Sequence, residues 1–205
     1  MKVKICGLQN MESAQYAVKQ GVDAIGFVFA KSKREISLNS AKSIISQLPK
    51  GINKVGVFVN PSREMIDEVV SKTGINVIQL HGDETPEFCA TLPYPVIKAF
   101  SIESVKDLER IHHYSCEYVL LDGPKGKYHG GNGISFDWGL LTSFDFKNKK
   151  VILAGGLNSE NVRSAIHLKN IDMVDVSSGV ETNGEKDLGK IKKFIATVKS
   201  TELIL

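Results

Sequence analysis

The chain has 205 residues, with 26 basic and 23 acidic side chains and a formal net charge of +3. This length suits one hydrophobic core, and α/β barrels commonly reach it without dividing, so we expect residues 1–205 to form a single domain. The weak charge and the lack of a long single-sign block argue against a dedicated nucleic-acid-binding protein.

Cysteine usage and hydropathy bear on where the protein works. The three cysteines, Cys6, Cys89 and Cys116, are an odd number without paired spacing, and no signal-like apolar segment opens the chain. These features predict a reduced, cytoplasmic protein. No apolar run reaches the roughly 18–20 residues of a membrane helix, and the five histidines lack metal-ligand spacing, so neither a membrane nor a metal is expected.

Short apolar runs of strand length alternate along the chain with stretches of helical pattern. The predicted strands are 2–6, 24–29, 54–59, 77–81, 95–99, 118–122, 151–154 and 173–176. The predicted helices begin at Asn10, at Asn39 or Ser40, after Pro61, near Thr85, at Ser101, near Phe136, at Asn158 and near Leu188. The helix from Asn39 or Ser40 is expected to reach Leu48, the one from Ser101 to reach His112, and the one from Asn158 to reach His167.

This alternation predicts a parallel sheet covered by helices. Eight units fit a closed (β/α)8 TIM barrel, which leaves no exposed sheet edge; an open doubly wound sheet is the alternative. In a barrel, the active site lies at the carboxyl ends of the strands.

Two glycine-bearing loops follow the last two predicted strands. Gly155 and Gly156 follow strand 151–154, while Ser178 and Gly179 follow strand 173–176. Barrels often bind a phosphate at these two places, because glycine allows close backbone approach. Tight turns alone are the alternative, and phosphate binding is the interpretation we favour.

Cys6 and Asp122 end two different strands at the predicted catalytic rim. A lone cysteine is usually a buried small hydrophobe, as expected of Cys89 and Cys116, but Cys6 shares a strand face with Lys4. That cation would lower the pKa of Cys6 and make it a usable base. Asp122 could cap its loop, but partial desolvation would let it hold a proton to donate.

Further polar residues have supporting or binding interpretations. Strands eight and one are neighbours in a closed barrel, so Asp175 is expected to pair with Lys4 inside it, as support first and catalysis second. Arg34, above strand two, offers a fork that matches a carboxylate. His81 ends strand four, where it could touch a substrate or be a satisfied structural histidine.

Two segments carry weaker expectations. Residues 123–133 contain five glycines, which favours a mobile lid over plain disorder. The apolar end Leu203–Leu205 suggests a subunit contact, so a monomer or a homodimer is expected.

The order and spacing of several motifs resemble one family over essentially the whole chain. The motifs are Lys4-Ile5-Cys6-Gly7, Gly26-Phe27-Val28-Phe29, Ser32-Lys33-Arg34-Glu35-Ile36-Ser37, Val57-Phe58-Val59-Asn60, Gln79-Leu80-His81-Gly82, Leu120-Leu121-Asp122, Gly155-Gly156-Leu157 and Asp175-Val176-Ser177-Ser178-Gly179-Val180-Glu181. Together they resemble the phosphoribosylanthranilate isomerases of tryptophan biosynthesis. Gln9 departs from the threonine usual in that family, which affects loop detail and leaves the chemistry intact.

The resemblance implies a cofactor-free barrel that performs an Amadori rearrangement on a phosphosugar. It implies Cys6 as the general base, Asp122 as the general acid and Arg34 as the ligand of the anthranilate carboxylate. The loops after strands seven and eight would hold the phosphate. Rival interpretations are another phosphate-binding barrel enzyme, such as an indole-glycerol-phosphate synthase or a ribulose-phosphate epimerase, and a non-catalytic phosphosugar-binding barrel.

Overall fold

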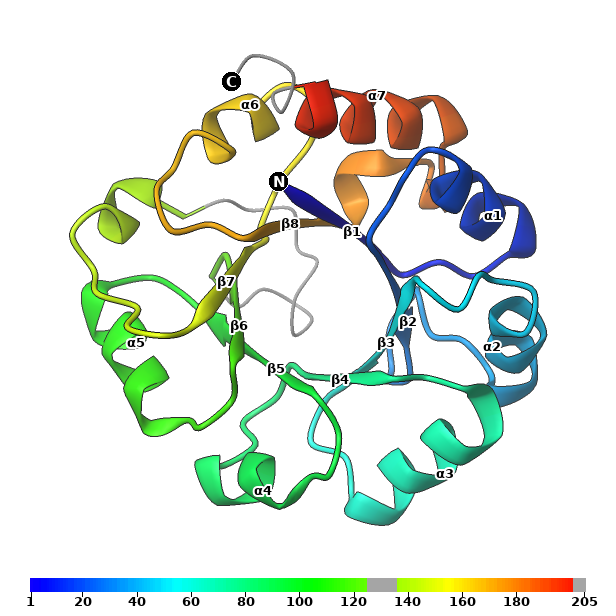
Figure 1. Cartoon of the computed structure of the whole chain (residues 1–205), viewed down its shortest axis with the longest axis horizontal. Helices are drawn as coiled ribbons and strands as arrows, with labels where there is room; N and C mark the ends of the chain where they lie inside the picture. The colour runs from blue at the N-terminus through cyan, green and yellow to red at the C-terminus, as the bar shows by residue number, and fades with distance from the viewer. Residues whose placement is uncertain (125–135, 201–205) are drawn as a thin grey trace.

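Eight parallel strands close into a barrel in the order of the chain, from β1 to β8. The computed structural model describes residues 1–124 and 136–200. The strands are β1 Lys2–Cys6, β2 Ala24–Val28, β3 Asn53–Phe58, β4 Val77–Leu80, β5 Val96–Ser101, β6 Tyr118–Asp122, β7 Lys150–Leu153 and β8 Met173–Val176. Figure 1 looks down the barrel, with the helices forming a ring around the strands. The TIM-barrel prediction is confirmed.

The barrel closes where β8 lies beside β1. Lys2 is in register with Met173 and Lys4 with Asp175, while the other edge of β1 pairs with β2. Every strand of the barrel therefore has two neighbours, and the open doubly wound alternative is wrong.

The described part of the chain contains seven α-helices and three short 3₁₀ helices. They are α1 Met11–Lys19, α2 Leu38–Ile45, α3 Arg63–Thr73, α4 Pro86–Thr91, α5 Val105–Glu109, η1 Arg110–His113, η2 Trp138–Leu141, α6 Val162–Ala165, η3 Ser178–Val180 and α7 Leu188–Lys199. None of the described helices is long and apolar enough to cross a membrane.

Capping side chains set several of the helix starts. Asn10 accepts a hydrogen bond from the backbone N–H of Ser13 and begins α1 as predicted. The predicted start of α2 at Asn39 or Ser40 is wrong, because Ser37 accepts the N–H of Ser40 and the helix begins at Leu38. A side-chain acceptor at the cap satisfies an N–H that the first turn leaves unpaired, and Ser37 supplies it here.

Two predicted helices are shorter than expected. The helix predicted over 101–112 starts only at Val105, because β5 continues to Ser101, and η1 replaces its last turn. The helix predicted from Asn158 begins at Val162, because the Asn158 carboxamide accepts the N–H groups of Glu160 and Asn161 and forms a turn there.

The apolar side chains form two clusters on the two faces of the barrel wall. In β5, Ile97 and Ala99 belong to the cluster inside the barrel. Val96 and Phe100 belong to the larger cluster between the strands and the helices. Strand side chains alternate between faces, so a wall packed on both sides produces the near-continuous apolar runs of the sequence.

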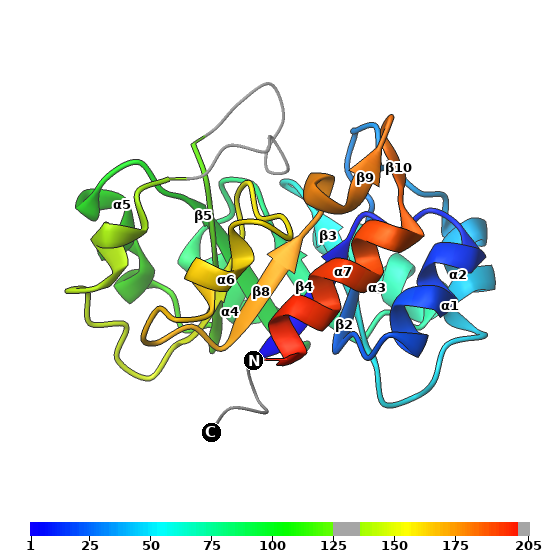
Figure 2. The same ribbon diagram turned by 90° about the horizontal axis from the view of Figure 1, so that it is seen from above.

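A small hairpin stands at the carboxyl end of β8. It consists of β9 Glu181–Thr182 and β10 Glu185–Lys186, which pair antiparallel directly after η3. Figure 2 shows it beyond the tip of β8, at the end of the barrel opposite the N-terminus. Residues 125–133 of the predicted lid and the apolar end Leu203–Leu205 lie outside the described residues.

Candidate active site

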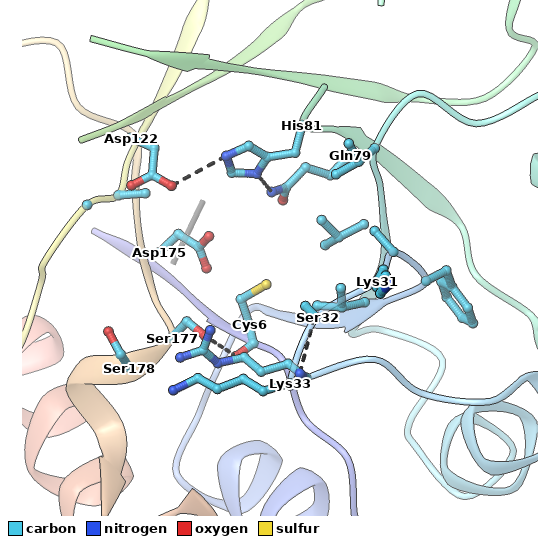
Figure 3. Close-up of a pocket in the computed structure, with 18 of the residues that line it drawn as sticks. Cys6, Lys31, Ser32, Lys33, Gln79, His81, Asp122, Asp175, Ser177 and Ser178 are labelled. Atoms are coloured by element: carbon cyan, nitrogen blue, oxygen red, sulfur yellow. Dashed lines mark hydrogen bonds and ion pairs between the residues drawn. The ribbon is translucent and has the colours of Figure 1, made fainter. Parts of the chain in front are cut away.

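A cavity of about 420 Å³ opens at the carboxyl ends of the strands. Its lining includes most of the residues singled out in the sequence, namely Cys6, Arg34, His81, Asp122, Gly155, Gly156, Asp175 and Ser178. Lys4 lies fully buried beneath it, and Gly179 packs behind it. Figure 3 shows Asp122 and His81 facing each other, with Asp175 and Cys6 between that pair and Ser177.

Cys6 occupies the last position of β1, against the backbone of β2. A Cβ atom on Gly26 would lie 2.8 Å from the Cys6 sulfur, so the glycine leaves the room that the thiol fills. Burial raises the pKa of the Cys6 thiol and outweighs the opposing effect of Lys4, while the charge of Asp175 raises it further. The expectation that Lys4 brings this pKa below its ordinary value is therefore wrong.

Lys4 and Asp175 pair inside the barrel, as their strand positions predicted. The Lys4 Nζ lies 3.0 Å from Asp175 Oδ2, and both residues are buried. The pKa of Lys4 is raised: burial opposes the charged form, but the attraction of Asp175 and Cys6 exceeds that penalty. Asp175 Oδ1 has no hydrogen-bond partner among the described residues, although it is buried. This oxygen is an acceptor available at the cavity.

Asp122 and His81 come from the ends of β6 and β4. Asp122 Oδ1 accepts the N–H of Gly123 at 2.8 Å, and His81 Nε2 lies 3.4 Å from Asp122 Oδ2. The Gln79 amide lies 3.2 Å from His81 Nδ1, which fixes the ring from its other side. The side chains of His81 and Asp122 are each 9% exposed. The Asp122 carboxyl group is therefore largely desolvated yet reachable from the cavity, which suits proton transfer.

Arg34 is held from behind by a carboxylate. Glu181 accepts from Arg34 Nε at 2.7 Å and from Nη2 at 2.9 Å, in a buried two-pronged ion pair. The guanidinium group has five N–H donors, and bonds to side chains within residues 1–124 and 136–200 use two of them, so three remain for a ligand there. Gly7 lets this side chain pass: its φ is +77°, and a Cβ there would lie 2.5 Å from Arg34 Cδ.

The two glycine loops touch each other across the top of β7 and β8. Gly155 and Gly156 have φ values of 79° and 65°, in the left-handed region that favours glycine. A Cβ on Gly179 would lie 1.9 Å from the Leu157 carbonyl oxygen, so only glycine permits this contact between the loops. The loops thus bring backbone groups and the Ser178 side chain to one wall of the cavity.

Sequence reasoning gave no role to three residues that lie in or behind this wall. Ser177 donates its hydroxyl to the Cys6 carbonyl oxygen at 3.1 Å. Lys186 donates to Glu181 Oε1 at 2.7 Å and to the Ser177 carbonyl oxygen at 3.0 Å. Glu181 stood within a quoted motif, but its partner Arg34 lies 147 positions earlier, and no local pattern reports such a pair. Lys186 sits in a short polar stretch that resembles an exposed turn.

The described residues contain no group of three or more His, Cys, Asp or Glu side chains that could hold a metal ion. Cys89 and Cys116, expected to be buried small hydrophobes, are indeed buried, away from the cavity.

The closed barrel and the polar cavity at the carboxyl ends of its strands define a (β/α)8-barrel enzyme. The model of the N-(5'-phosphoribosyl)anthranilate (PRA) isomerase family matches residues 3–197. The chain belongs to this family. It is an isomerase of tryptophan biosynthesis that interconverts an aldose and a ketose, and the resemblance seen in the sequence is confirmed.

Individual relatives agree. The N-(5'-phosphoribosyl)anthranilate isomerase of Bacillus cereus strain G9842 is 50% identical over 203 residues, which cover 98% of each chain. A solved structure of monomers of the dimeric Thermotoga maritima enzyme is 41% identical, with a TM-score of 0.87 and 98% and 99% coverage. A phosphoribosylanthranilate isomerase in complex with reduced 1-(o-carboxyphenylamino)-1-deoxyribulose 5-phosphate is 42% identical, with the same TM-score and coverage.

Proposed function

We propose that Cys6 and Asp122 perform the proton transfers of the isomerisation. Asp122, in its protonated form, donates to the furanose ring oxygen, so the ring opens and leaves an iminium group between C1 and the anthranilate nitrogen. The Cys6 thiolate then removes the proton from C2, and the electron pair neutralises the iminium as an enolamine. Tautomerisation of the enolamine gives the ketose. The observation that supports this assignment is the placement of one acid and one base, from the ends of two different strands, in a single cavity.

The binding groups fit a substrate with two anionic ends. The related enzyme crystallised with a reduced carboxyphenylamino deoxyribulose phosphate carries such a ligand. We assign the carboxylate to the remaining N–H groups of Arg34 and the phosphate to the loops of Gly155–Gly156 and Ser178–Gly179. Asp175 Oδ1 and His81 face the space between them, where the sugar hydroxyl groups would lie.

The remaining expectations are part of the same proposal. A cofactor-free, single-domain protein working in the cytoplasm is consistent with one barrel spanning β1 to β8 and three free cysteines. A monomer or a homodimer is expected, and the solved T. maritima relative is described as dimeric.

Turnover of phosphoribosylanthranilate, generated in situ and followed by the loss of anthranilate fluorescence, tests the assignment. We expect Cys6→Ser and Asp122→Asn each to lower kcat by at least about 10²-fold, the contribution of a positioned acid or base. Matched controls are Cys116→Ser, buried outside the cavity, and Asp145→Asn, exposed in a loop; both should retain wild-type kcat.

Near-wild-type turnover by either site variant would overturn its role. A wild-type protein that binds a phosphosugar but does not turn it over would restore the non-catalytic interpretation.

A further inference from the structure

Lys186 is a buried cation behind the cavity wall, next to Ser177, to which the proposed chemistry gives no task. Its side chain is only 4% exposed, although β10 lies on the surface of the barrel end. Ordering and desolvating a lysine is unfavourable unless its ammonium group finds partners. Here it finds three oxygens: Glu181 Oε1, the Ser177 carbonyl and, at 3.3 Å, Ser177 Oγ.

These partners connect Lys186 to two site residues. Through Glu181, which accepts from both cations, it borders the guanidinium of Arg34. Through Ser177, whose hydroxyl donates to the Cys6 carbonyl oxygen, it borders the end of β1. One ammonium group thus ties the hairpin to Ser177 of the cavity lining and to the carboxylate that holds Arg34.

The charges in this cluster do not cancel. Burial by itself would raise the pKa of Glu181, but hydrogen bonds from Arg34 and the charge of Lys186 hold it below its usual value, so Glu181 is a carboxylate. Two cations against one carboxylate leave a net positive charge next to Cys6. Burial lowers the pKa of Lys186 itself, while the charge of Glu181 opposes that change.

Other charged or titratable groups also face Cys6. Lys4 on β1 and Asp175 on β8 lie next to it, and its cavity is also lined by Lys31, Lys33, Arg34, His81 and Asp122. Lys4 is paired with Asp175 at 3.0 Å, so these two charges largely offset one another at the thiol. Lys186 and Arg34, by contrast, share one carboxylate, Glu181, so the positive charge of these two groups is not fully neutralised.

We propose that Lys186 is a positioning residue of the isomerisation: its ammonium group holds Glu181 against Arg34 and supplies positive charge that favours the Cys6 thiolate. This inference rests on the proposed role of Cys6 as the base. It predicts two separable effects of removing the charge, one on the proton affinity of Cys6 and one on the binding of the carboxylate end of the substrate by Arg34.

The experiment compares Lys186→Met with Lys186→Arg, which keeps the charge, and with Lys190→Met. Lys190 is the matched control because its Nζ donates to the backbone carbonyl of the same Glu181, at 2.7 Å. The first readout is the pH dependence of Cys6 alkylation by iodoacetamide, measured without substrate in a Cys89→Ala/Cys116→Ala background. That background is needed because a hydrogen bond from Cys89 lowers the pKa of Cys116 to about 7, which would make it compete.

We expect the alkylation rate of Cys6 in Lys186→Met to increase only at a higher pH than in the parent protein. The pH at which kcat/KM increases should shift upward as well. At pH 7, kcat/KM should fall by about 3- to 10-fold, as for one partly screened charge interaction. KM should rise as well, since Arg34 loses its fixed orientation. Lys186→Arg should restore both profiles, and Lys190→Met should leave them unchanged.

Unchanged alkylation and kcat/KM profiles in Lys186→Met would overturn the proposal, as would an equal shift in Lys190→Met. If Lys186→Met does not fold, Lys186→Gln makes the same comparison, because its amide can still donate to Ser177. Failure of the proposed function is distinguishable: Cys6→Ser would then retain activity, while the alkylation profile would still report whether Lys186 acts on the thiol.

Discussion

Two buried lysine–carboxylate pairs lie on opposite faces of the same barrel wall. Lys4 pairs with Asp175 inside the barrel at 3.0 Å, and Lys98 pairs with Glu84 at 3.1 Å. Lys98 alternates with Ile97 and Ala99 of the inner cluster, so it points out toward the helices. The two pairs have the same chemistry and nearly the same length, but their surroundings differ.

The outer pair is saturated with partners. Lys98 Nζ also donates to the carbonyl oxygens of Leu80, Gly82 and Ala99, and Glu84 accepts the N–H groups of Asn60 and Gly82. The inner pair keeps one carboxylate oxygen, Asp175 Oδ1, without a partner in the described part of the chain. A saturated pair fixes structure, whereas an unfilled acceptor beside a cavity is available to a ligand.

The largest expected effect comes from breaking the outer pair. Lys98→Met should lower the free energy of unfolding by about 3–5 kcal/mol, because Glu84 is left buried without its cation. Activity per folded molecule should stay near the wild-type value, since Lys98 does not line the cavity. Urea denaturation and kcat at low urea measure the two quantities.

The matched control is Glu68→Gln, which breaks the exposed pair with Lys72 on α3. It should change stability by no more than about 0.5 kcal/mol. A large fall in kcat of folded Lys98→Met would contradict the separation between the two faces.

Breaking the inner pair, Lys4–Asp175, should affect activity more than stability. Asp175→Asn keeps an acceptor but removes the charge, so kcat/KM should fall by about 10- to 100-fold, the size of one charged hydrogen bond to substrate. Its loss of stability should be smaller than that of Lys98→Met, because water in the cavity can reach the freed groups. Steady-state kinetics and urea denaturation of Asp175→Asn measure the two effects. If this variant is strongly destabilised but fully active, the proposed difference between the inner and outer pairs is wrong.

A smaller effect is expected at the glycine that lets Arg34 into the cavity. Gly7→Ala places a Cβ in the left-handed region and against Arg34 Cδ, which should destabilise the fold by roughly 1–2 kcal/mol. KM should rise more than kcat falls, because Arg34 is displaced while Cys6 and Asp122 stay. The control is Gly51→Ala, where nothing lies within 4 Å of the added Cβ and φ is not positive; equal KM values for the two variants would refute the prediction.

The smallest effect concerns acid stability at the cavity mouth. The folded pKa of Glu181 lies below its ordinary value of 4.5, so its contribution to stability is complete above that value and is lost as pH falls toward the folded pKa. Glu181→Gln should therefore flatten the pH dependence of the free energy of unfolding below about pH 4.5, and leave it unchanged at higher pH. Glu185→Gln, exposed on the same hairpin, should leave the slope unchanged.

The inner pair also shows what strand order makes predictable. Once eight strands are expected to close, β8 must lie beside β1, and the position of Asp175 within its strand brings it to the level of Lys4. The alternation of side chains then decides that both point inward. Helix limits were less predictable, since Ser37 and Asn39 both offer caps and only the local turn selects between them.

The pair Arg34–Glu181 shows the opposite case. Its partners lie 147 positions apart, in a loop and in a hairpin, where no strand register relates them. The sequence therefore indicated that Arg34 was available to bind a carboxylate, but could not show that a second carboxylate already orients it. The same limit applies to Lys186, whose burial depends on how the hairpin folds back onto Ser177.

The sequence by itself determined the eight-unit alternation, the closed barrel, the inward pairing of Lys4 with Asp175 and the family of the enzyme. These depend on periodicity and on the order of motifs along the chain, both of which can be read without distances between segments. Only the tertiary structure decided the direction of the Cys6 pKa and the cluster of Arg34, Glu181 and Lys186. Desolvation and charge interactions depend on distances between segments far apart in sequence, and folding alone sets those distances.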